Sequence, residues 1–296
     1  MHPLIFDNRS LTWGKRTYVM GILNLTPDSF SGDGLFVSAS PTPQGQAPGL
    51  REARRFLAAG VDILDIGGES TRPGSQPVDA KEELRRVLPT LRGILAEFPD
   101  ALISIDTYKA VVAEEALKAG AAIVNDVWGL RADPDLAGVV ARYRAAVVLM
   151  HNRSKPANVE VRDRLGNAYL GAEYRDLLED VKRELLESVA IARSAGIPDE
   201  HILLDPGLGF GKTVEQNLEL INRLDEIRAL GFPVLLGPSR KSFIGYTLNL
   251  PPEQRMEGTA ACVAIGIARG ADIVRVHDVE PILRVAHMTD AILRNK

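Results

Sequence analysis

The sequence of 296 residues contains a single cysteine, Cys262. One cysteine cannot form a disulfide within the chain, and it excludes a metal site built from several cysteines. The sequence also lacks an apolar run near the roughly 20 residues of a membrane-spanning helix, and its first residues lack the basic segment and apolar run of a signal peptide. These absences predict a cytoplasmic protein.

The sequence also lacks a large excess of positive or negative charge. Lys and Arg number 35 and Asp and Glu number 39, which gives a formal net charge of −4. Because these residues are interspersed, no basic stripe indicates nucleic-acid binding and no basic amphipathic helix indicates a membrane surface. Hydrophobic residues make up 45% of the chain, ample for a packed core. We expect a globular protein that can still bind a small anion through local charge.

Short apolar runs alternate along the chain with segments of helical periodicity. The expected strands cover residues 18–25, 61–66, 101–105, 121–124, 145–150, 201–204, 233–236 and 272–276. The expected helices cover residues 51–59, 79–98, 109–118, 134–143, 173–195, 214–230, 259–268 and 281–294. Eight strand-then-helix units in about the length of one barrel predict an α/β fold, a (β/α)8 TIM barrel, formed as a single domain by residues 1–296.

Polar residues interrupt this pattern just after the strands. In a parallel barrel the carboxyl ends of the strands meet at one mouth, where such folds place their sites. The residues concerned are Asn24, Thr71, Arg72, Asp106, Asn125, Asp205, Ser239, Lys241, Arg275 and His277. Their position predicts a binding site at that mouth.

Two of these carboxylates have simpler interpretations. Asp106 precedes a helix and could be its N-cap, and Asp205 could cap or brace the glycine loop that follows it. Alternatively, the two carboxylates and the amide of Asn125 could accept and donate hydrogen bonds along the edge of a planar heterocycle with adjacent N–H groups. The residues alone leave these possibilities open.

The glycine-rich segment PGLGFGKT, residues 206–213, is not a phosphate-binding P-loop, because Pro206 stands where that motif needs glycine. Its glycines either let the backbone approach a flat ligand or simply turn the chain. Lys241 could form a Schiff base, but it lies beside Arg240, and the two neighbouring cations could instead bind an anion or simply be solvated. Arg275 and His277 are two residues apart on a strand and therefore share a face, which favours an anion pocket.

Eight segments together resemble one known family, the dihydropteroate synthases. The segments are MGILNLTPDSFS (20–31), DILDIGGESTRPGS (62–75), SIDTYK (104–109), IVNDV (123–127), LMH (149–151), LLDPGLGFGK (203–212), GPSRKSFIG (237–245) and RVHDV (275–279). They follow the order of the family and span nearly the whole chain. The resemblance implies a pterin-binding barrel that joins (7,8-dihydropterin-6-yl)methyl diphosphate to 4-aminobenzoate, releasing diphosphate and forming dihydropteroate for folate biosynthesis.

The resemblance also implies roles for individual residues. Asp106, Asn125 and Asp205 would hold the edge of the pterin, while Lys241 would bond its ring and Arg275 would stack on it. Asn24 would contact Mg²⁺, and Thr71, Arg72 and His277 would serve the diphosphate. Phe30, Pro73, Phe210 and Ser239 would shape the aminobenzoate pocket.

The first loop departs from the family pattern. The family commonly reads SFSDGG where this chain reads SFSGDG, residues 29–34, so its acidic residue is displaced by one position. By this resemblance Asp33 would be the acid that faces the cation formed during transfer. Together with Lys241, Asp106 and Asp205, it completes the expected catalytic set.

Two other functions would use a similar pocket. A pterin-dependent methyltransferase of similar fold would need the same carboxylates and Asn125, but it would not explain NLTPDSF, ESTRPGS and RVHDV together. A catalytically silent pterin-binding protein would be expected to lack diphosphate residues such as Asn24, Arg72 and His277, which this chain has. The apolar, small-residue helix expected at 259–268, and the resemblance itself, predict a homodimer.

Overall fold

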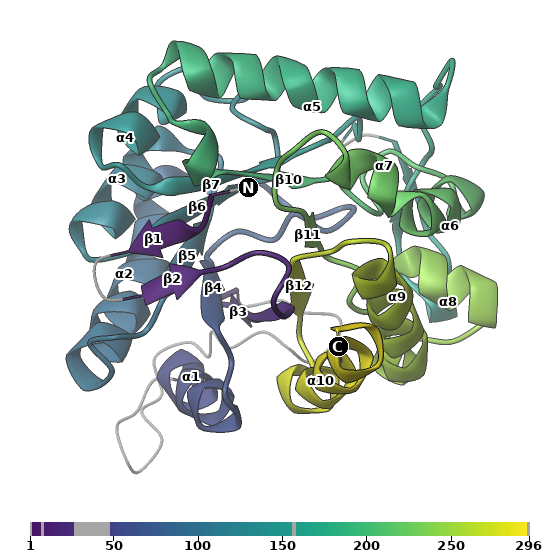
Figure 1. Cartoon of the computed structure of the whole chain (residues 1–296), viewed down its shortest axis with the longest axis horizontal. Helices are drawn as coiled ribbons and strands as arrows, with labels where there is room; N and C mark the ends of the chain where they lie inside the picture. The colour runs from purple at the N-terminus through teal and green to yellow at the C-terminus, as the bar shows by residue number, and fades with distance from the viewer. Residues whose placement is uncertain (1, 7–8, 27–47, 156–157, 295–296) are drawn as a thin grey trace.

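The structure is a computed structural model that describes residues 2–6, 9–26, 48–155 and 158–294. Two expected site residues, Phe30 and Asp33, lie outside these ranges. A parallel sheet occupies the centre, with strand order β10-β7-β6-β5-β4-β3-β12-β11, and helices surround it (Figure 1). A bridge between Leu204 and Val234 joins its two end strands and closes the barrel. The predicted (β/α)8 barrel is therefore confirmed.

The elements of the barrel follow the predicted alternation. Its strands are β3 (Tyr18–Asn24), β4 (Ile63–Gly67), β5 (Ile103–Asp106), β6 (Ile123–Asp126), β7 (Ala146–Met150), β10 (Ile202–Asp205), β11 (Leu235–Leu236) and β12 (Ile273–Val276). The helices are α1 (Pro48–Ala59), α2 (Ala80–Glu97), α3 (Ala110–Lys118), α4 (Leu136–Arg142), α5 (Leu177–Ser194), α6 (Val214–Asn222), α7 (Leu224–Arg228), α8 (Ser242–Leu248), α9 (Met256–Ala268) and α10 (Val279–Arg294).

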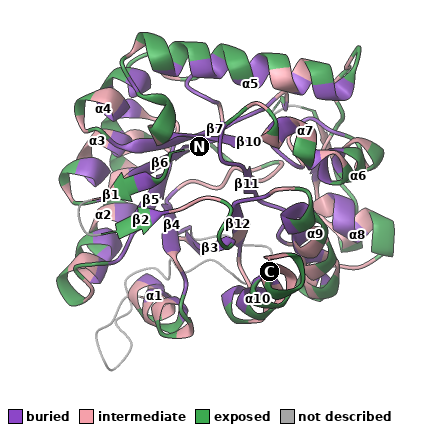
Figure 2. Ribbon diagram, viewed as in Figure 1, coloured by how far each residue is buried: buried purple, intermediate pink, exposed green. Residues whose placement is uncertain are grey.

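Burial on both faces explains why these strands are apolar runs rather than alternating patterns. Residues pointing outward, such as Leu64 and Val124, pack with the inner faces of the helices. Residues pointing inward, such as Met20, Ile63 and Leu203, fill the barrel. Figure 2 shows the result as buried strands at the centre and helices that are exposed on their outer sides.

The segment before the first barrel strand, for which the sequence predicted no element, contains two short strands. Strands β1 (Leu4–Phe6) and β2 (Arg9–Leu11) form an antiparallel hairpin in front of the barrel in Figure 1. Leu4 and Leu11 are buried with the inward-facing residues of the barrel strands. The hairpin therefore covers the end of the barrel opposite the carboxyl ends of the strands. Strands of three residues are too short to show the alternation of apolar and polar residues that predicts a strand.

Two further segments differ from the prediction. The helix expected over 214–230 is broken at Arg223 into α6 and α7, and both parts contribute fully buried residues, Leu220 and Leu224. The polar connection after β7 contains a small antiparallel hairpin of β8 (Val159–Glu160) and β9 (Ala168–Tyr169), which the sequence did not predict. Within the described ranges, no helix is long and apolar enough to cross a membrane.

Candidate active site at the barrel mouth

An arginine held between two carboxylates forms the floor of the mouth. Arg275 on β12 donates from Nε to Asp65 Oδ2 at 2.6 Å and from Nη2 to Asp106 Oδ2 at 2.5 Å. Strands β4 and β5 bring these carboxylates together, because Gly67 and Asp106 are register partners. Burial raises the pKa of Asp106, the Arg275 charge lowers it, and the Asp65 charge raises it again. Asp106 is not the N-cap of α3, since Lys109 occupies that position.

Asp65 is the main site residue that the sequence interpretation missed. Its side chain is fully buried, and its Oδ2 atom also accepts a hydrogen bond of 3.1 Å from Asn125 Nδ2 on β6. A signal was present, because a carboxylate within a strand buried on both faces needs a partner. The apolar residues around it, Val61, Ile63, Leu64 and Ile66, give the strand the appearance of an uninterrupted hydrophobic run.

Asp205 ends β10 and braces the glycine loop that follows it. Its Oδ1 atom accepts a hydrogen bond of 2.7 Å from the Gly207 backbone N–H, as the simpler interpretation proposed. Gly207 has φ +70°, and a Cβ there would lie 1.9 Å from the carbonyl oxygen of His151, so only glycine fits. Burial raises the pKa of Asp205 and the charge of Lys241 lowers it, which places these two groups within electrostatic reach.

Lys241 lies between the glycine loop and the floor. Its ammonium nitrogen donates to the carbonyl oxygen of Leu208 and lies 4.9 Å from the centre of the Phe210 ring. Burial lowers the pKa of Lys241 to about 8, although the Asp205 charge raises it. Because that pKa is above 7, Lys241 is mainly a cationic donor at neutral pH and not a free amine nucleophile.

A neutral histidine and an amide line the mouth at the ends of β12 and β3. Asn24 Nδ2 lies 3.5 Å from His277 Nε2, and Ser239 Oγ lies 3.0 Å from His277 Nδ1. Burial, followed by the charges of Arg72 and other cations, lowers the pKa of His277 well below its usual value. The positive field of Arg72, Arg240, Arg275 and Lys241 at this ring is what an anion pocket requires.

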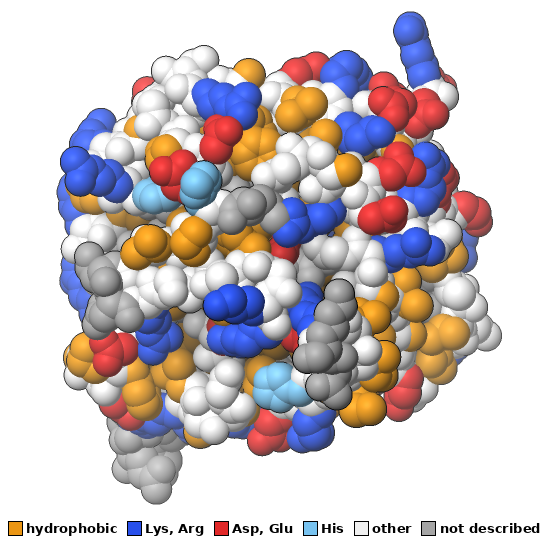
Figure 3. Space-filling model, in the orientation of Figure 1, with side chains coloured by type: hydrophobic (Ala, Val, Ile, Leu, Met, Phe, Trp, Pro, Cys, Tyr) orange, Lys and Arg blue, Asp and Glu red, His pale blue; other side chains and the backbone are white. Residues whose placement is uncertain are grey.

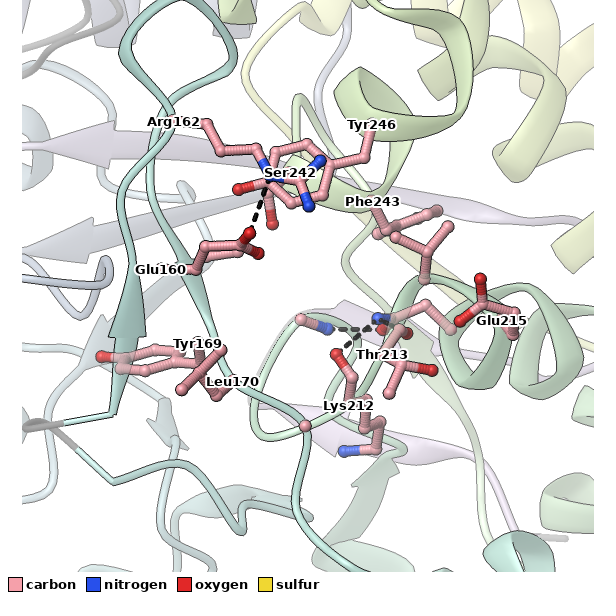
Figure 4. A pocket seen from close by; sticks show the side chains of 15 residues that line it. Glu160, Arg162, Tyr169, Leu170, Lys212, Thr213, Glu215, Ser242, Phe243 and Tyr246 are labelled. Atoms are coloured by element: carbon pink, nitrogen blue, oxygen red, sulfur yellow. Dashed lines mark hydrogen bonds and ion pairs between the residues drawn. The ribbon is translucent and has the colours of Figure 1, made fainter.

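A cavity of about 290 Å³ opens beside the mouth (Figure 4). Its walls come from the β8–β9 hairpin, the glycine loop after β10, and helix α8. Tyr169, Lys212, Ser242 and Tyr246 are among its lining residues. Of the expected aminobenzoate residues, Phe210 lies at its edge, with its ring centre 6.0 Å from that of Tyr169. The Pro73 carbonyl is held by the same hairpin.

A second buried cluster, which was not predicted from the sequence, supports the glycine loop after β10. Lys212 Nζ donates to the carbonyl oxygens of Gly207 at 2.8 Å and Phe210 at 3.2 Å, and it lies 3.0 Å from His151 Nδ1. His151 Nε2 in turn lies 3.0 Å from Glu184 Oε2 on α5. Burial lowers the pKa of Lys212 to about 7.

The residues at the mouth suit a weakly held hard cation. The described ranges contain no group of three or more His, Cys, Asp or Glu residues that could hold a metal ion. Asn24 turns its amide nitrogen towards His277, which leaves its amide oxygen directed away from that ring. One amide oxygen fits Mg²⁺, which keeps several waters and takes few protein ligands when a substrate phosphate supplies the others.

Comparisons with known proteins agree with this geometry. Residues 20–277 match the model of the family described as pterin binding enzyme. A dihydropteroate synthase from Clostridium beijerinckii is 49% identical over 95% of this chain and 96% of its own length.

Two solved structures are also similar. A dihydropteroate synthase from Clostridium difficile, solved in the presence of pteroic acid, is 48% identical with a TM-score of 0.82, covering 98% of this chain and all of its own. One from Xanthomonas albilineans, solved with 4-aminobenzoic acid, is 38% identical with a TM-score of 0.81, covering 96% of this chain and 94% of its own. The chain therefore belongs to the dihydropteroate synthase family, the pterin-binding transferases of folate biosynthesis.

Proposed function

We propose that this transferase joins (7,8-dihydropterin-6-yl)methyl diphosphate to 4-aminobenzoate with the residues gathered at its barrel mouth. The products are 7,8-dihydropteroate and diphosphate. The observation that carries the assignment is the floor, where Arg275 is fixed between Asp65 and Asp106 beside the amide of Asn125. These groups present a flat set of donors and acceptors at the bottom of a cationic mouth.

The pterin would bind on this floor. Asp106, Asn125 and Asp205 lie at the ends of β5, β6 and β10 and can pair with the amide and amine groups of the pterin edge. Lys241 is placed to donate to a ring acceptor, and the guanidinium of Arg275 offers a planar face for stacking. Buried carboxylates paired with fixed cations change little on binding, so the pocket is preorganised.

The diphosphate would leave towards Asn24, Thr71, Arg72 and His277. Arg72 supplies positive charge at His277, and the neutral ring of His277 can donate or accept one hydrogen bond without adding charge. Asn24 would provide the protein ligand to Mg²⁺. When bound, Mg²⁺ would supply positive charge that stabilises the diphosphate as a leaving group.

The transfer would be dissociative. The C–O bond to the diphosphate breaks, and its electron pair leaves with that group. The resulting cation is delocalised over the pterin, where the carboxylates of Asp106 and Asp205 stabilise it. The lone pair of the arylamine then forms the C–N bond, and the amine releases one proton to water or diphosphate. Asp33 would add a further negative charge near the cation.

The acceptor would bind at the edge of the mouth next to the cavity. Phe210 would offer an aromatic wall there beside Tyr169, and Ser239 and Pro73 would contribute from two other loops. Phe30 would complete this pocket from the first loop. An apolar slot with a cation nearby suits an aromatic ring that carries a carboxylate.

The test is to follow dihydropteroate and diphosphate together after mixing the protein with Mg²⁺, the pterin diphosphate and 4-aminobenzoate. We expect equimolar products, and a loss of about 100-fold or more in kcat/KM for Lys241→Ala or Asp205→Ala. Asp199→Asn is the matched control, because Asp199 pairs with Arg193 on the surface. Tight pterin binding without product would overturn the proposal in favour of a silent binding protein. Transfer of a methyl group to an acceptor, in place of dihydropteroate formation, would favour a methyltransferase.

We further propose that the chain acts as one cytoplasmic barrel domain, residues 1–296, within a homodimer. Exposed hydrophobic side chains on α9 and α10 support the dimer, among them Ile265, Met288 and Ile292. Figure 3 shows hydrophobic side chains over the region of α8 and α9. A monomer mass that stays constant with concentration in ultracentrifugation would contradict a dimer.

A further inference from the structure

The β8–β9 hairpin connects three separate parts of the active-site rim. It lies in the connection between β7 and α5, between the short motifs LMH (149–151) and LLDPGLGFGK (203–212). Its two strands pair through Val159 with Tyr169 and Glu160 with Ala168. A two-stranded ribbon this short is not stable by itself, so its position depends on contacts with its neighbours.

One side of the hairpin is fixed to the region of α8 and α9. The tip residues Arg164, Leu165 and Gly166 make these contacts. Arg255, which is 2% exposed, donates to the Leu165 carbonyl at 2.6 Å, and Tyr246 donates to the Gly166 carbonyl at 3.1 Å. Arg164 donates to the Asn249 carbonyl at 3.0 Å. The tip is therefore anchored to helices of the barrel wall.

The base of the hairpin is fixed to the glycine loop after β10. The Ala172 backbone N–H donates to the Gly211 carbonyl at 2.9 Å. The ring of Tyr169 packs beside that of Phe210 at 6.0 Å between centres, with an interplanar angle of 31°. Tyr169 also lines the cavity beside the mouth, as Figure 4 shows.

The third contact reaches the loop after β4, which carries the expected substrate residues Thr71, Arg72 and Pro73. Tyr169 donates its hydroxyl to the Thr71 carbonyl at 3.1 Å, and Asn167 donates its amide to the Pro73 carbonyl at 3.3 Å. Gly74 has φ +86°, and a Cβ there would lie 3.3 Å from Asn167 Nδ2. The absence of a side chain at Gly74 thus lets Asn167 approach the loop closely.

We propose that Tyr169 and Asn167 are positioning residues, through which the hairpin holds the loop 71–74 against the pocket for the aminobenzoate acceptor. Anchored at its tip and base, the hairpin acts as a rigid bracket, and its hydrogen bonds to the Thr71 and Pro73 carbonyls connect the loop to it. Tyr169 performs two tasks, since its hydroxyl fixes the loop and its ring supports Phe210. Burial raises the pKa of Tyr169, so its hydroxyl remains a donor at neutral pH.

This inference rests on the proposed function for the identity of the acceptor, but the contact between hairpin and loop can be tested without substrate. Tyr169→Phe removes the hydroxyl and keeps the ring, and Asn167→Asp replaces the donor with a carboxylate that repels the Pro73 carbonyl. Tyr143→Phe is the matched control, because that hydroxyl bonds Glu114 between α3 and α4, away from the mouth.

The first measurement is hydrogen exchange of peptides covering residues 68–76 in the substrate-free protein. We expect about fivefold faster exchange in Tyr169→Phe and Asn167→Asp, the effect of losing one hydrogen bond, and no change in Tyr143→Phe. Unchanged exchange in both hairpin variants would overturn the bracket. This result does not depend on whether the proposed reaction is correct.

The second measurement separates KM from kcat. We expect KM for 4-aminobenzoate to rise about 5- to 10-fold in Tyr169→Phe. The Kd of the pterin substrate and Tm should stay unchanged, because the hairpin bonds the loop and not Asp106, Asn125 or Asp205. A fall in kcat at constant KM, or equal weakening of pterin binding, would overturn the acceptor role. An inactive parent protein would refute the proposed function, while the exchange experiment would still test the bracket.

Discussion

A single buried carboxylate organises the floor of the mouth. Asp65 is the shared acceptor for the guanidinium of Arg275 and the amide of Asn125, through the same oxygen atom. Its other oxygen, Oδ1, is buried and makes no hydrogen bond within the described part of the chain. A buried polar atom of this kind marks a place for an ordered water or a ligand group. Asp65 therefore fixes the orientation of two groups assigned to the pterin.

We expect Asp65→Asn to impair both folding and binding. The substitution keeps the shape of the side chain but removes one of the two carboxylate charges that face Arg275, which then pairs with the carboxylate of Asp106. Weakening a buried ion pair should lower the free energy of unfolding by about 3 kcal/mol. The pterin Kd should rise about tenfold or more, because Arg275 and Asn125 lose their orientation. Urea denaturation and calorimetric titration measure these two effects.

A surface carboxylate provides the comparison for this substitution. Asp199→Asn breaks an exposed pair with Arg193 and should change the free energy of unfolding and the pterin Kd only slightly. Wild-type pterin affinity in Asp65→Asn would show that the residue serves only the barrel and not the ligand.

At the scale of elements, the sequence predicted the strands and helices that are long enough to show a hydrophobic pattern. The eight barrel strands were recognisable because parallel strands buried on both faces are apolar runs, each followed by a polar turn. Helix α8, with seven residues, and the two-residue strands β8 and β9 are too short to show a period. The break at Arg223 has no proline or glycine to mark it. Contacts such as Tyr169 with Thr71 join residues 98 apart, which local patterns cannot predict.

Only part of the candidate site was predictable from the sequence. Residues at strand ends, such as Asp106 and Arg275, were found because topology alone brings them to one mouth. Asp65 was missed because it lies inside a strand among apolar neighbours. The cluster of Lys212, His151 and Glu184 was missed because its members come from three elements and support the loop without facing the mouth.

This cluster links β7 and α5 to the glycine loop through a neutral histidine. His151 is 1% exposed, accepts from Lys212 at Nδ1 and donates to Glu184 from Nε2. Burial, with the Lys212 charge, lowers the pKa of His151 to about 4, although Glu184 raises it. In the folded protein the His151 ring therefore stays neutral at pH values well below the usual pKa of histidine.

Stability should consequently fall as the pH is lowered from about 6.5 to about 4. In that window the unfolded chain binds a proton at His151 that the folded chain does not, so the free energy of unfolding decreases as pH falls. The contribution is at most about 1.4 kcal/mol per pH unit. Urea denaturation at several pH values should show a shallower slope for His151→Gln.

An exposed histidine gives the control for the pH series. His287 lies on the outer side of α10, and His287→Gln should keep the wild-type slope. Parallel pH profiles for wild type and His151→Gln would contradict the assignment of a buried neutral imidazole.

At the scale of the whole molecule, the two ends of the barrel have different tasks. The carboxyl ends of the strands carry the charged and polar groups of the site. The opposite end is closed by the β1–β2 hairpin, whose Leu4 and Leu11 pack with the apolar residues inside the barrel. In such barrels the first end determines activity and the second contributes stability.

Substitutions in β1 should therefore separate stability from catalysis. Leu4 is fully buried, and Leu4→Ala should lower the free energy of unfolding by about 2 to 4 kcal/mol through the cavity it leaves. Ile5, on the other face of the same strand and 63% exposed, is the matched control. Ile5→Ala should change the free energy of unfolding by less than about 0.5 kcal/mol. Both variants should keep kcat/KM within about twofold while folded, because neither contacts the mouth. A large loss of kcat/KM in folded Leu4→Ala would mean that the hairpin end is coupled to the site through the barrel interior.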